Sequence, residues 1–542
     1  MNVPKQCFKA SHKKAVLLPH FDRSTDDRED GKKQRATWNK QVEFILSCVG
    51  YAVGLGNIWR FPFLCYKSGG GAFLVPYILF LVICGIPQFF LEMSLGQFGS
   101  LGFVSVWKIS PIFKGLGFGM AVVSLIACVY YNVVIAWSLY YIYYSISMPW
   151  STCDNPWNTL NCVSQDDSNV SPIKNKIEVL NSTQSKDLLK SSLNVSKMMS
   201  SEEFWLFHVL RQSAGIDHVG ALQWPLVLAL FIAWAIVFIC AAKGIKTSGK
   251  VVYITATLPY FVLVCLLIRG LTLPGSWNGI KFFLKPKWTK LLAFKVWGDA
   301  ATQIFYSSGT AWGALLTMAS HNKFNNNVYR DSMLIPLVNS GTSILAGFVV
   351  FSYLGFMSYE TGKNIEDVVS QGPGLVFVVY PEAISRLPLS AVWAFLFFFM
   401  LFAVGLDTQF VKFESIVSAL ADEYPRFLQK RKTLFSAILC LLLFALGLPC
   451  VTQGGIYVVQ LMDWYSAAFS LMFFSLFATI AVAWIYGIEK YLLKWRHQTL
   501  HGRYLVLTCV RQHLLCLSKS VDSTARKTAY ALPAMLGSQL EW

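Results

Sequence analysis

Long apolar runs constrain this chain more than any other feature. About ten of them have the length that a helix needs to cross the hydrocarbon core of a bilayer, roughly twenty residues. They are residues 42–66, 71–97, 116–146, 224–242, 249–270, 297–319, 332–356, 391–420, 433–449 and 455–487. Backbone N–H and C=O groups left unpaired in hydrocarbon are costly, so such runs are expected to be helical. The sequence therefore predicts an all-α polytopic membrane protein with about ten spans.

Charged residues indicate how these spans are oriented. They make up only 14% of the 542 residues, whereas soluble proteins have about 25%. The Lys and Arg residues behind the net charge of +17 lie mostly in tails and short connections, so topology explains them and we expect no nucleic-acid partner. Basic clusters in the N-terminal tail and after the fourth, eighth and tenth runs place both termini in the cytoplasm. No cleavable signal peptide is recognisable, so the first span is expected to direct insertion into the plasma membrane.

The long polar connection at residues 150–223 tests this orientation. It follows the third run, and the positive-inside rule predicts that this run ends on the outer side of the membrane. Three acceptor sequons in it predict glycosylation on that outer side, at Asn169, Asn181 and Asn194. Cys153 and Cys162 stand in the same loop, in an oxidising compartment, and we expect them to form a disulfide. The alternative is two free thiols.

The first apolar run is poorly suited to a continuous helix. Residues 47–63 contain three glycines, Asn57 and Arg60. A break at membrane depth is tolerated only where it lines a protein-buried or watery cavity, so a broken span is a candidate ligand site. Helical spacing would place Gly50, Val53, Gly54 and Asn57 on one face, where carbonyl and amide oxygens could hold a cation. The alternative is close helix packing, since Gly50 and Gly54 also form a small-xxx-small motif.

A second broken span is expected in the sixth run, where Ser, Gly and Thr residues at 307–313 lie at mid-membrane depth. Interrupted spans five apart fit an inverted five-plus-five repeat with its binding site between the two breaks. Asp407, in the eighth run, adds to this picture, because an ionisable group in an apolar span is costly unless it is paired. A bound cation would neutralise it. A distant Arg partner or a protonated carboxyl is the alternative.

Four motifs resemble those of the sodium- and chloride-dependent neurotransmitter symporter family. They are residues 51–62 (YAVGLGNIWRFP), 69–73 (GGGAF), 243–250 (KGIKTSGK) and 405–408 (GLDT), and the resemblance covers roughly residues 40–490. Within the family the chain is most similar to the branch that carries glycine, proline and a broad range of neutral and basic amino acids. The implied organisation is a cytoplasmic tail (1–40), a first inverted repeat (41–270, including the loop 150–223), an extracellular loop (271–296), a second repeat (297–488) and an atypical cytoplasmic tail (489–542).

The resemblance also implies sites for two kinds of ion. Two sodium ions would be bound by oxygen donors, as a hard cation requires: Ala52, Asn57, Ser307 and Asn339 at the first site, and Gly50, Val53, Val404, Asp407 and Thr408 at the second. Chloride would be bound by Tyr77, Gln303, Ser307, Asn339 and Ser343, none of which is negatively charged. Chloride-independent relatives have a carboxylate near the position of Ser343, so a chloride ion would supply the missing charge. Singly, Ser343 or Gln303 would more often form an interhelical hydrogen bond.

Position 54 indicates the substrate class. Monoamine transporters of the family have an aspartate where this chain has Gly54, so here the substrate is expected to bring its own carboxylate, as an amino acid does. Tyr131 would bind that carboxylate, Tyr306 would close over it, and Arg60 with Asp463 would form the outer gate. The implied substrate residues are Gly54, Gly56, Tyr131, Tyr306, Ser308, Gly309, Trp312 and Thr408. Trp312 suggests a short substrate, although a tryptophan at helical spacing is more often ordinary packing.

These expectations define a function and an alternative. The function is a sodium-coupled, chloride-dependent symporter that imports a small neutral amino acid such as glycine by alternating access. Members of the family generally have twelve spans, and here a basic tail stands in place of the last two. The alternative is therefore a truncated, non-transporting isoform that regulates a full-length relative by association, as a homo- or hetero-oligomer. No set of catalytic side chains converges in the sequence, so we expect no enzyme activity.

Overall fold

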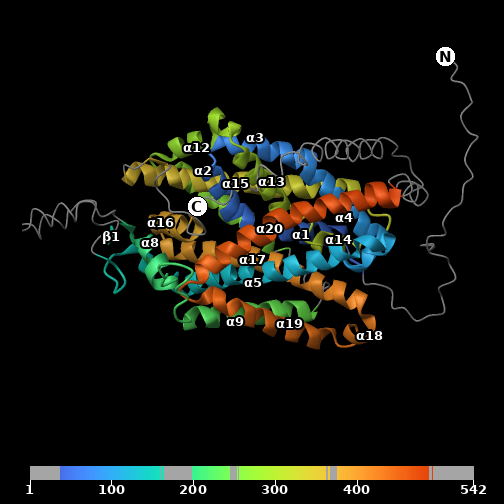
Figure 1. The fold of residues 1–542 in the computed structure, drawn as a ribbon. Coiled ribbons are helices and arrows are strands. Elements are labelled where there is room, and N and C mark those ends of the chain that lie inside the picture. Colours follow the sequence, from blue (N-terminus) through green and yellow to red (C-terminus); the bar gives the residue numbers. More distant parts are fainter. Residues whose placement is uncertain are drawn as a thin grey trace, which may run out of the picture. The chain divides into compact units, whose positions relative to one another are not determined.

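The computed structural model describes residues 37–38, 40–159, 162–163, 198–243, 253, 255–361, 364–365, 375–487 and 491 (Figure 1). Nearly all of these residues that have regular structure are helical. The α-helices are α1 (Gln41–Ala52), α2 (Phe61–Lys67), α3 (Gly71–Phe80), α4 (Ile86–Gly99), α5 (Lys114–Tyr144), α8 (Ser200–Glu203), α9 (Trp224–Lys243), α11 (Leu258–Leu271), α12 (Ser276–Leu284), α13 (Phe294–Ser308), α14 (Ala314–Ala319), α15 (Val328–Thr361), α16 (Tyr380–Ser385), α17 (Ser390–Glu423), α18 (Pro425–Leu428), α19 (Lys432–Gly447) and α20 (Gly455–Ile480).

Shorter helical turns connect or extend these helices. In the described ranges, five are π-helical: Gly56–Arg60, Leu81–Gly85, Phe204–Val209, Leu375–Val379 and Ala481–Gly487. Five are 3₁₀ turns: Ser105–Ile109, Pro111–Phe113, Pro149–Ser151, Trp288–Leu292 and Leu448–Val451. Among the described residues, strands occur only in one parallel pair, β1 (Cys162–Val163) and β2 (Met198–Met199), which aligns Cys162 with Met198.

The helices account for the predicted spans. Within the described ranges, seven helices are long and apolar enough to cross a membrane: Gly71–Gly99, Pro111–Tyr144, Trp224–Ala242, Val328–Tyr359, Ser390–Glu423, Lys432–Val451 and Gly455–Gly487. Counting two bent pairs raises the number to nine: Gln41–Ala52 with Gly56–Lys67, and Leu258–Leu271 with Ser276–Leu284. The remaining predicted span corresponds to α13 and α14, which are separated by a break. The all-α membrane fold is therefore confirmed.

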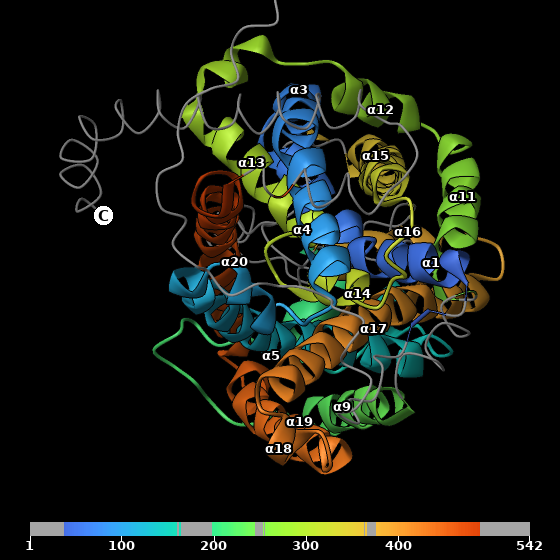
Figure 2. The same cartoon turned by 90° about the vertical axis from the view of Figure 1, so that its right-hand side faces the viewer.

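The helices that carry the predicted site residues lie together. α5 and α17 pack against each other, and α1 packs against both α15 and α17. Around them, α9 packs on α19, while α11 and α12 pack on α15, as the end-on view in Figure 2 shows. Large apolar side chains such as Phe231 and Leu441 are exposed on the outer helices, as expected for surfaces that face lipid.

The connection after α11 is more ordered than a simple loop. The sequence predicts an extracellular loop at 271–296, but α12 lies within it and bends 114° away from α11. A Cβ at Gly279 of α12 would lie only 1.8 Å from the carbonyl oxygen of Phe351 in α15. The absence of a side chain at Gly279 therefore lets the two backbones meet.

The connection that follows α5 contains the predicted disulfide. Cys153 and Cys162 are joined in the structure, so the prediction is confirmed. Glu203 of α8 holds this part of the loop, because its carboxylate accepts hydrogen bonds from the Asn158 side chain (3.1 Å) and the Thr159 backbone N–H (2.9 Å). The glycosylation sequons at Asn169, Asn181 and Asn194 lie outside the described residues, as do almost all of the two predicted tails.

Candidate ion and substrate site

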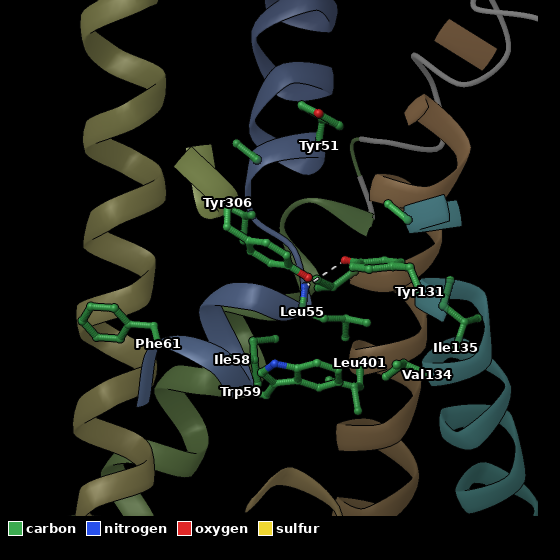
Figure 3. Close-up of a cluster of buried hydrophobic side chains, with 14 of the residues drawn as sticks. Tyr51, Leu55, Ile58, Trp59, Phe61, Tyr131, Val134, Ile135, Tyr306 and Leu401 are labelled. Atoms are coloured by element: carbon green, nitrogen blue, oxygen red, sulfur yellow. Dashed lines mark hydrogen bonds between the residues drawn. The ribbon is translucent and has the colours of Figure 1, made fainter. Parts of the chain in front are cut away.

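The first break lies between Ala52, where α1 ends, and Gly56, where a π-helical turn begins. Backbone N–H groups that the break leaves without a helical carbonyl partner form hydrogen bonds with nearby side chains. The N–H of Gly54 donates to Asn57 Oδ1 (3.0 Å), and the N–H of Leu55 donates to Tyr131 Oη of α5 (3.0 Å; Figure 3). The predicted break in the first span is therefore present, and the axis bends there by 47°. Helical spacing does not by itself align Gly50, Val53, Gly54 and Asn57, because α1 ends at Ala52. Their polar groups converge because the chain unwinds.

The second break lies between Ser308, the end of α13, and Ala314, the start of α14. Gly309, Ala311 and Gly313 adopt left-handed backbone conformations, with φ of +71°, +64° and +85°. A Cβ at Gly309 would lie 2.3 Å from the Tyr51 ring, so the close approach requires glycine there. Tyr51 Oη donates to the Gly309 carbonyl (3.1 Å), which joins the two breaks directly.

Glu92 of α4 supports the second break. Its Oε1 accepts a hydrogen bond from the backbone N–H of Ala311 (2.5 Å), and the residue is buried. A carboxylate can satisfy an N–H that the broken helix leaves without its usual carbonyl. The sequence analysis missed this role, although an acidic residue in the apolar run 71–97 is a readable signal for a functional group.

The residues predicted for the first sodium site are brought together by Asn57. Its Nδ2 donates to Asn339 Oδ1 (2.8 Å) and to Ser343 Oγ (2.8 Å) of α15. Asn339 Nδ2 in turn donates to Ser307 Oγ of α13 (3.0 Å). Ala52, Asn57 and Ser307 also line one cavity. A set of amide, hydroxyl and carbonyl oxygens of this kind suits a hard cation.

Asp407 of α17 has the features expected of a cation ligand. It is 8% exposed, and its Oδ2 has no hydrogen-bond partner among the described residues. A Cβ at Gly50 would lie 3.2 Å from this oxygen, so the carboxylate faces α1. Within the described part of the chain, no Lys or Arg nitrogen lies within 4.0 Å of Asp407. A buried, uncompensated carboxylate in a span fits the predicted second sodium site.

The other residues predicted for that site lie close in the chain to Asp407 and Gly50. Thr408 Oγ1 donates to the carbonyl of Tyr51 (3.2 Å), which ties α17 to the end of α1. Val53 immediately follows α1, and Val404 lies about one helical turn before Thr408. The structure thus brings α1 and α17 together where the resemblance implies a cation.

The predicted chloride residues come from three helices. Tyr77 Oη of α3 donates to Ser340 Oγ of α15 (3.2 Å), one turn before Ser343. Gln303 Nε2 of α13 donates to the carbonyl of Gly56 (3.3 Å), while Ser307, Asn339 and Ser343 share the network around Asn57. All five are buried and carry no formal charge. Hydroxyl and amide donors can bind an anion, so this set fits the group that the resemblance implies.

A small cavity lies where the breaks meet. It has a volume of about 20 Å³ and is lined by Tyr51, Ala52, Gly54, Gly56, Asn57, Tyr131, Tyr306, Ser307, Gly309, Thr408 and Lys412. Six of the eight predicted substrate residues are among these. The other two, Ser308 and Trp312, lie just outside: Ser308 Oγ bonds Thr310 Oγ1 (3.0 Å), and the Trp312 ring packs edge-on against Tyr306. Lys412 was not predicted as a cavity residue.

The predicted outer gate is closed by charge and by an aromatic ring. Arg60 Nη1 lies 3.8 Å from Asp463 Oδ1 of α20, an ion pair beyond hydrogen-bond distance. The Arg60 guanidinium also lies 4.1 Å from the centroid of the Tyr306 ring. Cation–π contacts of this length are attractive, so Arg60, Asp463 and Tyr306 together cover one end of the cavity.

Comparisons with known proteins agree with this architecture. Residues 35–510 match the profile of the sodium:neurotransmitter symporter family. The chain is 48% identical over 480 residues to the sodium- and chloride-dependent glycine transporter 2 of Xenopus laevis, covering 86% of this chain and 61% of the relative. It is 50% identical over 471 residues to glycine transporter 1 of the same species, covering 86% and 74%. It is 46% identical over 472 residues to GABA transporter 2 of Rattus norvegicus, covering 85% and 75%.

A solved structure shares the fold. The crystal structure of MhsT in complex with L-phenylalanine superimposes with a TM-score of 0.69 at 20% identity, covering 89% of this chain and 96% of MhsT. The chain spans about three fifths to three quarters of the length of the curated relatives named above. With the family profile covering most of its residues, the chain belongs to the sodium:neurotransmitter symporter family.

Proposed function

We propose that this protein is a sodium-coupled, chloride-dependent symporter that imports a small neutral amino acid such as glycine. The observation that carries the proposal is the cavity at the two helix breaks, where the N–H of Leu55 and the hydroxyl of Tyr131 lie beside a residue without a side chain, Gly54. Two relatives are named as glycine transporters and one as a GABA transporter, and all three names include sodium and chloride dependence.

The substrate carboxylate binds beside Gly54, with Tyr131 as its hydroxyl donor. The lining of the cavity contains no carboxylate side chain, so an amino acid brings the negative charge that the first sodium ion needs. This sodium is bound by Ala52, Asn57, Ser307 and Asn339. Because the substrate completes the sodium site, the two ligands bind cooperatively, with a coupling of about 1–3 kcal/mol.

The second sodium ion neutralises Asp407, together with Gly50, Val53, Val404 and Thr408. Chloride, bound by Tyr77, Gln303, Ser307, Asn339 and Ser343, balances the charge that the neutral Ser343 leaves uncompensated. Both assignments are supported by the chemistry of the side chains: a buried carboxylate with an unbonded oxygen for the cation, and uncharged donors for the anion.

The size of the cavity supports a short substrate. Its volume of about 20 Å³ is little more than a water molecule needs. Tyr306 and Trp312 limit the room for a side chain. Glycine therefore needs the least rearrangement among the amino acids.

Alternating access is supported by a second cavity on the other side of Asp407. It is lined by Trp38, Ser47, Gly50, Thr317, Met318, His321, Asp407, Phe410, Val411, Glu414, Ser415 and Ser418. Trp38 lies at the end of the predicted N-terminal tail (1–40), just before α1, whereas the Arg60–Asp463 pair lies beyond the break that follows α1. Asp407 thus lines a cavity that it shares with Trp38, on the side proposed to be cytoplasmic.

Tracer uptake tests the proposal. The full chain is expressed in cells with low background transport, and glycine uptake is measured in sodium chloride, with sodium replaced by choline and with chloride replaced by gluconate. Surface biotinylation in parallel measures delivery to the plasma membrane. We expect uptake that requires both ions. Protein that reaches the surface but transports neither glycine nor other small amino acids would contradict the proposal and support the non-transporting regulator.

A further inference from the structure

The substrate cavity contains one residue whose charge the ion and substrate assignments above do not use. Lys412 of α17 lines the cavity and is only 5% exposed. Its ammonium lies 4.3 Å from the centroid of the Trp312 ring and 4.7 Å from that of Tyr131. Within the described residues, no carboxylate oxygen lies within 4.0 Å of it.

The nearby carboxylates have other roles. Asp463 pairs with Arg60 (3.8 Å), and Glu92 accepts the Ala311 N–H (2.5 Å). Asp407 lies more than a turn earlier on α17 and lines the second cavity, not this one. Aromatic faces compensate a buried ammonium only partly, and a charge inside a membrane span is costly unless it has a counterion. The ammonium therefore lacks an anion at the point where the substrate binds.

We propose that Lys412 is a specificity-determining residue whose ammonium binds a second carboxylate on the substrate, so that the cavity accepts short acidic amino acids. The inference rests on the proposed function, because it assumes that an amino acid occupies this cavity. It extends the substrate class beyond glycine to amino acids with a carboxylate side chain. It also predicts rejection of amino acids that carry a second cationic group, which Lys412 repels.

The geometry provides two separate positions for the two carboxylates. The first lies at Gly54, where the Tyr131 hydroxyl and the Leu55 N–H meet, and the second lies over the ring of the same tyrosine, where Lys412 is placed. A short dicarboxylic amino acid could therefore place one carboxylate at the Tyr131 hydroxyl and the other over the Tyr131 ring, beside Lys412. Lys412 has a flexible four-carbon stem, so its ammonium can withdraw along the rings to admit the side chain.

The charges of the cavity lining lead to the same class. Lys412 is the one residue with a formal charge among the described residues that line the cavity. A substrate with a second carboxylate would bring a counterion into the cavity, which favours an acidic amino acid over an isosteric neutral one.

The test compares aspartate with asparagine, which have nearly the same shape and differ in charge. Binding to the purified full chain is measured in sodium chloride by scintillation proximity with tritiated aspartate, asparagine and glycine. We expect the native chain to bind aspartate at least tenfold more tightly than asparagine. Equal binding of the two, or tighter binding of asparagine, would overturn the inference. Binding of glycine in sodium chloride without binding of aspartate would also overturn the inference.

Variants at the lysine identify the cause. Lys412→Met keeps most of the stem and removes the charge, so the preference for aspartate should fall at least tenfold, whereas Lys412→Arg should retain it. Lys287→Met is the matched control, because Lys287 also lies over an aromatic ring, Phe282 (5.5 Å), but is exposed and outside the cavity. An aspartate preference that survives Lys412→Met would refute the assignment. Sodium-independent binding of all three amino acids would instead count against the proposed function.

Discussion

Gly54 connects ion binding to substrate binding, and its surroundings allow a graded test. A Cβ at this position would lie 2.9 Å from Thr408 Oγ1 and 2.9 Å from Tyr131 Oη. Both contacts are too short, so Gly54→Ala overpacks the site by about 1–3 kcal/mol and should weaken amino acid binding by roughly 5- to 150-fold. The side chain would displace the tyrosine hydroxyl proposed to bind the substrate carboxylate.

Gly54→Asp adds a charge to the same clash. Two carboxylates about 4 Å apart repel by about 4 kcal/mol at an effective dielectric constant of 20, which corresponds to about a further thousandfold loss of affinity. The new carboxylate would also supply the first sodium site with its own anion. Sodium binding should then no longer depend on the amino acid, so the reciprocal coupling should disappear.

The assay combines amino acid binding, uptake and surface biotinylation for both variants. Gly298→Ala is the matched control, because Gly298 lies in α13 and a Cβ there would meet nothing within 4 Å. We expect the control to behave like the native chain, and both Gly54 variants to reach the surface. An aspartate variant that binds a neutral amino acid with normal affinity would refute the reasoning. If both variants instead fail to reach the surface, Gly54 serves helix packing alone.

Three further predictions concern other parts of the molecule. Ser343→Glu introduces a fixed negative charge in place of a buried hydroxyl, which accepts a hydrogen bond from Asn57 (2.8 Å). Uptake in gluconate should therefore approach uptake in chloride. Unchanged chloride dependence would exclude Ser343 from the anion site. Asp407→Asn removes the charge from an oxygen without a hydrogen-bond partner among the described residues, and the sodium concentration for half-maximal uptake should rise at least tenfold; an unaltered sodium titration would contradict this role. In the connection between α5 and α9, burial and then the positive charge of Arg211 lower the pKa of His208 from its ordinary value of 6.5. The stability that neutral His208 contributes is present above that value and is lost as the pH falls through the lower, folded-state pKa. Limited proteolysis should therefore cut this loop faster at about pH 5 than at about pH 8, and the difference between the two rates should be smaller in His208→Phe. Equal rates at the two pH values in the native chain would argue against this role of His208.

The helix breaks and the disulfide were predictable because their chemistry is local. The residues that end α1 and α13 lie in the breaks themselves: glycines, and Asn57, whose Oδ1 accepts the N–H of Gly54. Cys153 and Cys162 are close in sequence and share one loop. In such cases the partner lies within a few residues, so the sequence contains both halves of the interaction.

Partners that depend on helix packing were not predictable. Glu92 is readable as a costly charge in a span, but its partner Ala311 lies 219 residues away. The contact exists because α4 approaches α14 closely, and a Cβ at Gly96 would lie only 2.1 Å from the carbonyl oxygen of Leu316. Lys412 is similar: its position in a span suggests a function, but only the packing of α17 against α5 reveals that it faces the Tyr131 ring.

The two breaks are joined by side chains of one short segment, and this gives a physical route for coupling. Tyr51 donates through its hydroxyl to Gly309 and accepts through its carbonyl from Thr408, so it contacts the second break and α17 at once. On the other side of the first break, Asn57 reaches Asn339, which reaches Ser307 of α13. Each proposed sodium site therefore takes ligands from one short segment, Ala52 and Asn57 for the first ion and Gly50 and Val53 for the second. Coupling between sites needs a shared element that both ligands bias, and the segment from Gly50 to Asn57 is placed to be that element.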